Sequence, residues 1–232
     1  MKLQTQILTV SILSLALSIT TTAQIVQQFE FNDAEMTSLS AAANSAGMVQ
    51  YVKDLPGYSL NGESLVITTA GPGKGIESFS DNSTPLAYNS GAYQIDTTLS
   101  WTIQDDGSDQ TFHVSLMDDN INKTTADISL EFRSGGSNVQ INSRAFGGGT
   151  ESAVYSGFSL SESNIQLRSV VDFDSRTIET FYNTGDGFIS TGPAGSLSPQ
   201  RGGNWLRIRT TGNWSGPAEK LEVDSISYTK LR

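Results

Sequence analysis

Two neighbouring segments with alternating apolar and polar residues constrain the fold of this chain more than any other feature. In residues 127–133 an apolar side chain occupies every second position, and residues 139–144 repeat the pattern. A period of two places one set of side chains on the buried face of a β-strand and the other set on the opposite face. Gly135 and Gly136 lie in the turn between the segments, so the sequence predicts an antiparallel β-hairpin.

The same alternation recurs along most of the remaining chain, in segments 93–103, 111–117, 165–173, 177–182, 205–209 and 221–228, with weaker strand patterns at 24–31 and 57–69. Residues 71–91 are rich in Gly, Ser, Asn and Pro and predict a long loop. Short strands at hairpin spacing, without intervening helices, are typical of two-sheet proteins. We therefore predict an all-β fold, a single two-sheet antiparallel jelly-roll sandwich. Its predicted core residues are Phe112, Val114, Leu116, Ile128, Leu130, Phe132, Ile141, Leu167, Val171, Leu206 and Ile208.

Residues 1–23 have the pattern of a secretory signal peptide. Lys2 gives a charged start, residues 7–19 are apolar but too few to span a bilayer, and residues 21–23 are small. A single-pass anchor is the alternative, but no stop-transfer pattern follows. Cleavage before Gln24 leaves 209 residues (232 − 23), which suits one jelly-roll domain over residues 24–232. We therefore expect a secreted protein, extracellular or periplasmic.

The composition excludes several classes of chemistry. The chain has no cysteine, which excludes thiol catalysis and cysteine-ligated metals, and its single histidine, His113, cannot build a zinc site of several histidines. The formal net charge is −10, and loss of Lys2 with the signal peptide makes it −11. Such acidity disfavours nucleic acid and anionic membranes as the main partners. We expect a soluble monomer.

Several segments resemble known jelly-roll families. Residues 165–187 (IQLRSVVDFDSRTIETFYNTGDG) are similar to paired strands of concanavalin A-like and laminin-G-like domains, the lectin and glucanase superfamily. Residues 221–228 (LEVDSISY) are similar to the last strand of those domains, and also to the last strand of galactose-binding-like carbohydrate modules. Residues 29–33 (FEFND) are similar to the opening of both. The resemblance implies extracellular glycan recognition, sometimes with a structural calcium ion and sometimes with glycan cleavage.

The polar positions of the predicted strands form a candidate ligand-binding face that includes five of the eight arginines of this acidic chain. A guanidinium binds a carboxylate or sulfate through two parallel hydrogen bonds, and a tryptophan ring can stack on a sugar. We therefore predict that an acidic polysaccharide, with uronate or sulfate groups, is the partner. The alternative is a solvated face whose arginines pair with nearby carboxylates. The candidate binding residues are Glu131, Arg133, Gln140, Asn142, Arg144, Arg168, Trp205 and Arg207, with His113, Gln166 and Arg209 on the same face.

A small polysaccharide lyase that cleaves uronic-acid glycan by β-elimination is the second hypothesis. That reaction needs a group that neutralises the uronate carboxylate, a base and an acid. The candidates are Arg133 or Arg144, His113, and a tyrosine such as Tyr155 or Tyr182, with Arg133, His113 and Tyr182 as the predicted set. Jelly-roll lyases use Arg, Gln or Asn, His and Tyr, but this chain lacks the Gln-x-His pairing and the lysine–tyrosine motif of the alginate lyase family. Whether the protein is an enzyme therefore stays open, and a structural or adhesive surface protein is the third hypothesis.

One structural calcium ion is the cofactor that the sequence suggests. The resemblance at both chain ends implies that Glu30 and Asp33 meet Asp224 around such an ion, which would add stability where disulfides are missing. Asp105 and Asp109 also carry oxygen ligands, but aspartates close hairpin turns without any ion, and we favour the turn role.

Overall fold

The computed structural model describes residues 23–31, 49–52, 58–68, 74–79, 89–105, 107, 109–118, 124–146, 152–192, 195–203, 205–212 and 220–232. These residues form sixteen β-strands and no helix, so the described part of the chain has no helix that could cross a membrane. Apart from Ala23, the predicted signal peptide lies outside them. The strands are β1 (Gln24–Glu30), β2 (Val49–Val52), β3 (Tyr58–Leu60), β4 (Leu65–Ile67), β5 (Lys74–Phe79), β6 (Ala92–Thr102), β7 (Gln110–Met117), β8 (Thr124–Phe132), β9 (Val139–Ala145), β10 (Ser152–Phe158), β11 (Ser161–Asp172), β12 (Thr177–Asn183), β13 (Ile189–Ser190), β14 (Gly195–Ser196), β15 (Trp205–Gly212) and β16 (Lys220–Lys230).

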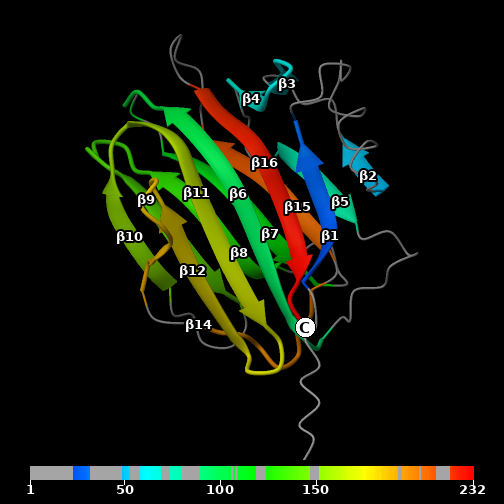
Figure 1. Cartoon of the computed structure of the whole chain (residues 1–232). Coiled ribbons are helices and arrows are strands. Elements are labelled where there is room, and N and C mark those ends of the chain that lie inside the picture. The colour runs from blue at the N-terminus through cyan, green and yellow to red at the C-terminus, as the bar shows by residue number, and fades with distance from the viewer. Residues whose placement is uncertain are drawn as a thin grey trace, which may run out of the picture.

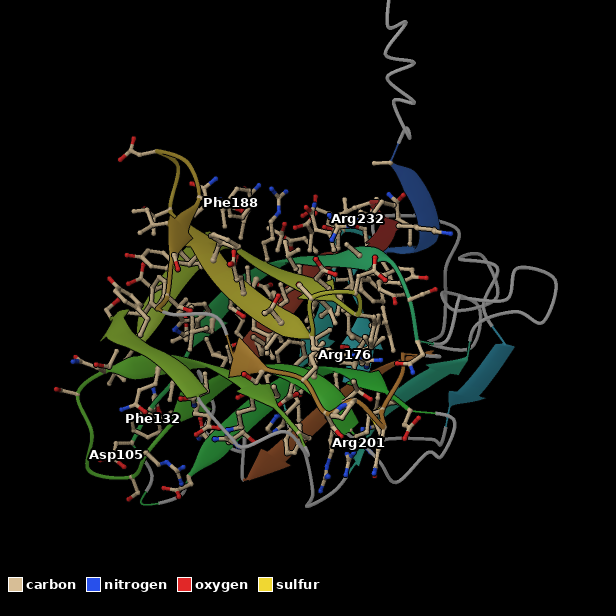
Figure 2. The ribbon with its side chains drawn as sticks, turned by 90° about the horizontal axis from the view of Figure 1, so that it is seen from below. Asp105, Phe132, Arg176, Phe188, Arg201 and Arg232 are labelled. Atoms are coloured by element: carbon tan, nitrogen blue, oxygen red, sulfur yellow. The ribbon has the colours of Figure 1, made fainter. Side chains whose placement is uncertain are left out.

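The strands build two sheets that pack face to face (Figure 1). Sheet A has the order β13-β12-β11-β6-β16-β4-β3, with β1 also paired to β16 and β14 to β12. Sheet B has the order β10-β9-β8-β7-β15-β5-β2. Figure 2 shows the two layers from below, with Phe188 on the sheet A side and Asp105 on the sheet B side. All the pairings are antiparallel, which confirms the predicted two-sheet antiparallel sandwich.

Apolar side chains from both sheets fill the space between them. All the predicted core residues are buried, and they are joined by large aromatic side chains, among them Tyr93 and Trp101 of β6 and Tyr228 of β16. The rings of Tyr93 and Tyr228 stack with their centres 5.2 Å apart. Each fully buried side chain of this size contributes about 1.5–3 kcal/mol, so the core supplies stability to a chain without disulfides.

A chain of buried hydroxyl groups joins the two sheets inside this core. Thr180 of β12 donates a hydrogen bond to Ser143 of β9 across the sandwich, at 2.7 Å, and the hydroxyl of Ser169 of β11 lies 3.0 Å from that of Thr180. All three residues are buried. Because a buried hydroxyl that loses its partner is destabilising, this network fixes the position of β9 relative to β11 and β12.

Strand β5 corrects the sequence prediction, which assigned residues 71–91 to a loop. It pairs with β15 over six residues and with β2 on its other side. Its sequence, KGIESF, contains a glycine and two charged residues and has no clear alternation. Pairing between distant segments makes it a strand: Ile208 faces Ile76, 132 residues earlier in the chain (208 − 76).

The outer faces of the two sheets differ in burial. In β6 of sheet A, buried inward residues alternate with half-buried outward residues from Tyr93 onward. In β8 of sheet B, every residue from Thr125 to Phe132 is buried, including the outward Asp127, Ser129 and Glu131. Buried charged groups need compensating partners. The outer face of sheet B is therefore where a functional site is to be sought.

Candidate functional site

The register of sheet B places polar side chains in two rows across four strands, and alternation along each strand directs them away from the core. The first row consists of Asn142 of β9, Ser129 of β8, His113 of β7 and Arg209 of β15. The second row consists, in the same strand order, of Arg144, Asp127, Ser115 and Arg207. We refer to these two rows, together with Glu131 and with Arg133 just beyond the end of β8, as the arginine face.

Glu131 holds two of the arginines in place. Its carboxylate is 3% exposed and accepts hydrogen bonds from Arg133 at 3.1 Å and from Arg144 at 2.5 Å. The hydroxyl of Ser129 donates to the same carboxylate at 3.1 Å. Because these donors occupy its oxygens, Glu131 positions the two guanidinium groups and leaves ligand contact to them.

Arg133 is also fixed from the turn side. It donates to Asp109 at 3.0 Å, and Asp109 accepts the backbone N–H of Ser134 as well. The Ser134 N–H and then the Arg133 hydrogen bond lower the pKa of Asp109. The hydrogen bond to Asp109, followed by the charge of Glu131, raises the pKa of Arg133. Asp109 thus closes a turn, as expected, and Arg133 carries its charge on a side chain that is 59% exposed.

His113 is held by hydrogen bonds at both ring nitrogens. Nδ1 lies 2.9 Å from a carboxylate oxygen of Asp127, and Nε2 lies 3.1 Å from the hydroxyl of Thr111. Ser115 donates to the other Asp127 oxygen at 2.8 Å. A carboxylate only accepts hydrogen bonds, so Nδ1 carries a proton, and in the neutral ring Nε2 accepts from Thr111. This arrangement fixes the tautomer and orientation of His113.

Two buried donors at opposite ends of the first row have no hydrogen-bond partner among the described residues. They are Nδ2 of Asn142, a residue only 4% exposed, and Nε of Arg209. A buried donor without an acceptor costs about 1–3 kcal/mol, so each such group in a native protein calls for an explanation, and a bound water, ion or ligand is one. Asn142 and Arg209 lie three strand spacings apart, roughly 14 Å. A ligand that satisfies both has to be extended across the sheet.

Arg168 lies on the opposite side of the molecule, which corrects its assignment to the candidate binding face. It belongs to β11 of sheet A, where its Nε donates to Asp96 of β6 at 2.7 Å. Its guanidinium also lies 3.9 Å from the centre of the Phe188 ring. Gln166 shares this outer face of sheet A and accepts from Asn183 at 2.9 Å. Alternation predicts the two faces of a strand but not the sheet that the strand joins, so residues of two sheets were combined.

The other predicted binding residues belong to sheet B. Gln140 of β9 is half-buried and faces Glu131 in the register. Arg207 donates to the hydroxyl of Thr124 at 3.1 Å. Trp205 begins β15, but its side chain lies outside the described residues, so its role in stacking on a sugar stays a prediction.

The three residues considered for a lyase are not brought together. His113 and Arg133 lie on the outer side of sheet B, whereas Tyr182 of β12 points into the sandwich and is 8% exposed. The Tyr182 ring stacks on that of Tyr155 of β10 with their centres 4.3 Å apart. The hydrogen bond with Tyr155, followed by burial, raises the pKa of Tyr182. Sheet B therefore separates Tyr182 from a ligand bound beside His113.

The predicted calcium ligands are described only in part. The backbone of Glu30 pairs with Ser225, next to Asp224 of β16, but the side chain of Glu30 and all of Asp33 lie outside the described residues. Burial, together with the charges of Glu222 and Glu63, raises the pKa of Asp224. Within the described part of the chain, no group of three His, Asp or Glu residues could hold a metal ion. The calcium ion stays a prediction.

Sequence reasoning missed Asp127 and Ser129, although both belong to the segment that dominated it. Each follows the outward alternation that singled out Glu131, and Asp127 orients the single histidine of the chain. The signal that could have found them is the pairing of β7 with β8, since a hairpin register places His113 beside Ser129 and one row from Asp127.

No protein-family model matches the sequence, and no curated protein matches it. Solved structures do. An endo-1,3-beta-glucanase from Streptomyces sioyaensis matches with a TM-score of 0.57 and 12% identity, over 90% of this chain and 96% of that chain. An alginate lyase from Pseudomonas aeruginosa gives 0.56 and 10%, over 89% and 98%. A legume lectin-like domain from Entamoeba histolytica gives 0.53 and 12%, over 77% and 88%. At these identities the likeness shows the fold alone, and it confirms the jelly-roll sandwich predicted from the sequence.

Proposed function

We propose that this concanavalin A-like jelly-roll protein is secreted and binds extracellular polysaccharide on the arginine face, with uronate or sulfated glycans as the preferred ligands. The observation that carries the proposal is a pair of buried donors at the two ends of one row, Asn142 Nδ2 and Arg209 Nε, which have no hydrogen-bond partner among the described residues. Proteins with a similar fold include a lectin-like domain, a glucanase and an alginate lyase, whose names all refer to carbohydrates or carbohydrate-directed activity. This agreement supports a polysaccharide ligand.

The charge of the arginine face favours an anionic ligand. The face carries four of the eight arginines, Arg133, Arg144, Arg207 and Arg209, in a chain with a formal net charge of −10. Its acidic groups are Asp109, Glu131 and Asp127, and all are engaged by Arg133, Arg144, His113 or Ser115. With His113 neutral and Glu77, the register partner of Arg207 in β5, included, four positive and four negative charges balance here. An anionic chain therefore meets four arginines on a surface that is far less negative than the protein as a whole.

The length of the row favours a polymer over a small anion. A single carboxylate or sulfate group cannot reach donors that stand roughly 14 Å apart across three strand spacings. A polysaccharide that crosses β9, β8, β7 and β15 can offer one oxygen to Asn142 and an acidic group to Arg209. Because the four strands are tied by regular backbone pairing, the donors are held in place before the ligand arrives, which lowers the entropic cost of binding.

Cleavage of a uronic-acid glycan is the second candidate function. The observation in its favour is His113, whose ring is oriented by the buried carboxylate of Asp127 at 2.9 Å, an arrangement that suits a general base. Against it, Nε2 of His113 is occupied by Thr111 and Tyr182 lies in the core. Binding without cleavage is therefore the function that the geometry supports best.

Substitution of single arginines on the two sheets tests the proposal. Arg209→Ala should weaken binding to a polyuronate or a sulfated polysaccharide by about tenfold to a hundredfold, since a charge-assisted hydrogen bond is worth about 1.5–3 kcal/mol. Arg168→Ala removes the same charge from sheet A and is the matched control. Binding would be measured by calorimetric titration at fixed salt. Equal losses in both variants would show a mere net-charge effect and contradict the proposed site.

Incubation of the protein with the same kinds of polysaccharide distinguishes binding from cleavage. β-Elimination leaves an unsaturated uronate that absorbs in the near ultraviolet, so incubation with a panel of uronic-acid polysaccharides reveals a lyase directly. We expect no rise in absorbance with any member of the panel. A rise that disappears in His113→Ala, while binding is kept, would replace the binding function with cleavage.

A further inference from the structure

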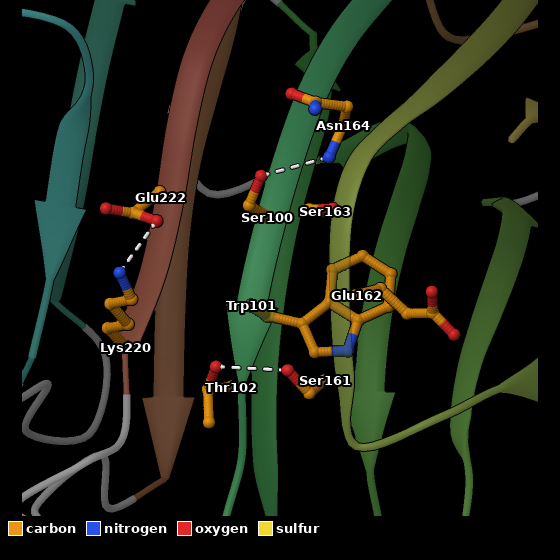
Figure 3. Close-up of a pocket in the computed structure, with 9 residues that line it drawn as sticks. All are labelled: Ser100, Trp101, Thr102, Ser161, Glu162, Ser163, Asn164, Lys220 and Glu222. Atoms are coloured by element: carbon orange, nitrogen blue, oxygen red, sulfur yellow. Dashed lines mark hydrogen bonds and ion pairs between the residues drawn. The ribbon is translucent and has the colours of Figure 1, made fainter. Parts of the chain in front are cut away.

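The outer face of sheet A contains a polar hollow that is separate from the arginine face (Figure 3). Its volume is about 360 Å³, and it lies across three adjacent strands, β11, β6 and β16. Ser100 and Thr102 of β6, which are short side chains, lie along its middle. Asn164 of β11 lies on one side, and Lys220 and Glu222 of β16 lie on the other. Short residues on the central strand between longer ones on its neighbours account for the depression.

An irregularity in β11 shapes one side of the hollow. The pairing of β11 with β6 shifts between Glu162 and Ile165, and Asn164 adopts a φ of 56°. The backbone N–H of Asn164 donates to the hydroxyl of Ser100 at 3.0 Å in place of a regular strand partner. A β-bulge re-aims the side chains around it, and here the amide of Asn164 stands exposed at the rim.

The hollow is rich in hydroxyl groups and nearly self-neutralising in charge. Thr102 and Ser161 lie 3.3 Å apart across the strands, and Lys220 forms an ion pair with Glu222 at 3.1 Å. The carboxylate of Glu162 also lines the hollow, but its Oε1 accepts two hydrogen bonds from Ser159. Hydroxyl and amide groups both donate and accept hydrogen bonds. One lysine against two carboxylates disfavours an anionic ligand.

We propose that this hollow is a second glycan-binding site, which takes neutral, hydroxyl-rich sugar units. Its volume falls at the lower end of the range for small-molecule sites, about 300–1,000 Å³, and two strand spacings give it a width of roughly 10 Å. Hydroxyl groups of a sugar can exchange hydrogen bonds with Ser100, Thr102 and Asn164, and can bridge Lys220 and Glu222. The inference does not rest on the arginine face. Because the two sites lie on opposite outer faces of the sandwich, one molecule can hold a neutral chain and an anionic chain at once.

This site is tested by titrating the full chain separately with cellohexaose, xylohexaose and laminarihexaose. The measurement is the change in the amide chemical shifts. We expect at least one of these neutral oligosaccharides to shift the amide signals of residues 100–102, 161–164 and 220–222, with a dissociation constant in the millimolar range. Ser163→Trp places a large side chain at the exposed rim and should weaken this binding at least tenfold. Ser196→Trp, at an equally exposed serine of β14, is the matched control and should leave it unchanged.

Glu222→Gln provides a second test that adds no bulk, since it breaks the ion pair with Lys220 and should weaken neutral-sugar binding severalfold. Titration of the same variants with a polyuronate separates the two sites: Ser163→Trp should bind it normally, and Arg209→Ala should keep the neutral sugar. No binding of any neutral oligosaccharide, or shifts confined to the arginine face, would overturn the inference. If the parent protein binds a neutral oligosaccharide but no polyuronate, the result would instead count against the arginine face.

Discussion

The charged residues on the outer faces of the two sheets differ in how deeply they are buried. On sheet A, Arg168 and Asp96 pair at 2.7 Å while both side chains remain about one-third exposed. On sheet B, the carboxylate of Glu131 is 3% exposed and is shared by Arg133 and Arg144. An exposed pair gains little from its own attraction because water screens it. A buried carboxylate, by contrast, depends on its partners.

The difference shows where the fold holds side chains rigidly. The buried carboxylate of Glu131 fixes two guanidinium groups at once, those of Arg133 and Arg144, and Asp109 holds Arg133 from the other side. Side chains that are fixed in advance suit a ligand-binding surface. On sheet A, Ser100 and Thr102 are half-buried, and the neighbouring Ser161 and Ser163 are exposed, so these hydroxyl groups are open to solvent. That surface suits a weak ligand that replaces water without meeting a fixed charge.

The largest contrast should appear when one carboxylate is neutralised on each sheet. Glu131→Gln should cost about 2–4 kcal/mol of unfolding free energy, slightly below the 3–5 kcal/mol of a fully buried pair, because Arg133 can turn to water. Asp96→Asn on sheet A should cost at most about 1 kcal/mol. Urea unfolding of both variants measures the difference. Equal costs would show that the two faces do not differ as described.

The hydroxyl network between the sheets should give the next effect. Thr180→Val keeps the shape of the side chain but removes the hydroxyl that contacts both Ser143 and Ser169. The variant should lose about 1–3 kcal/mol, because two buried hydroxyls then lack that partner. Ser156, an exposed residue of the edge strand β10, offers the control Ser156→Ala, with an expected change below about 0.5 kcal/mol. An unchanged urea midpoint for Thr180→Val would show that the network does not tie the sheets together.

A stabilising substitution sharpens the distinction between unpartnered groups in the core and on the arginine face. The hydroxyl of Tyr228 is buried and has no hydrogen-bond partner among the described residues, and burial raises the pKa of Tyr228 well above its usual value. Tyr228→Phe should therefore gain about 1 kcal/mol in thermal or urea unfolding. Asn142→Ala should instead reduce glycan binding. If Tyr228→Phe loses stability, the hydroxyl of Tyr228 has a hydrogen-bond partner outside the described residues.

The smallest change in stability should come from substitution of Asp224. Because its pKa is raised in the folded state, the folded form keeps the proton to a higher pH than the unfolded form, whose value is about 3.9. The contribution of Asp224 to the free energy of unfolding therefore falls as the pH rises from the unfolded pKa through the folded pKa. Above the folded pKa it remains lower. Asp224→Asn should raise the melting temperature slightly at neutral pH in chelator, and the gain should vanish in acid.

Calcium should reverse that small effect if the predicted ion binds. Added calcium should then raise the melting temperature of the parent protein but not that of Asp224→Asn, because a carboxylate ligand is lost. Identical melting temperatures of the parent protein in chelator and in calcium would contradict the predicted calcium ion.

The fold could be predicted from the sequence because alternation is a local signal. Ile128, Leu130 and Phe132 were assigned to the core from their spacing alone, and all are buried. Strand β5 could not be found in the same way, since Lys74–Phe79 becomes a strand through pairing with β15 and β2. Local spacing contains no information on partners more than a hundred residues away.

The candidate site could be predicted only in part for a related reason. Arg133, Arg144 and Asn142 were assigned to the correct face, but Arg168 was added to it because its strand shows the same alternation in the other sheet. Tyr182 was considered as an acid because of its chemistry, whereas its register with Leu167 places it on the inner side of sheet A. Asn142 Nδ2 and Arg209 Nε have no hydrogen-bond partner among the described residues, and the spacing of residues in the sequence does not reveal this.

The position of β16 has a consequence for how the protein is made. This eleven-residue strand, the last in the structure, lies between β6 and β4 in sheet A, and β1 pairs along it as well. During synthesis, β6 and β1 therefore lack this neighbour until more than a hundred further residues have left the ribosome, and sheet A is complete only after residue 230 has emerged. Such distant pairing makes folding slow and leaves strand edges open meanwhile. Removal of residues 220–232 would therefore divide sheet A, because β1 and the β3–β4 pair would lose their connection to β6, whereas removal of an edge strand would merely shorten a sheet.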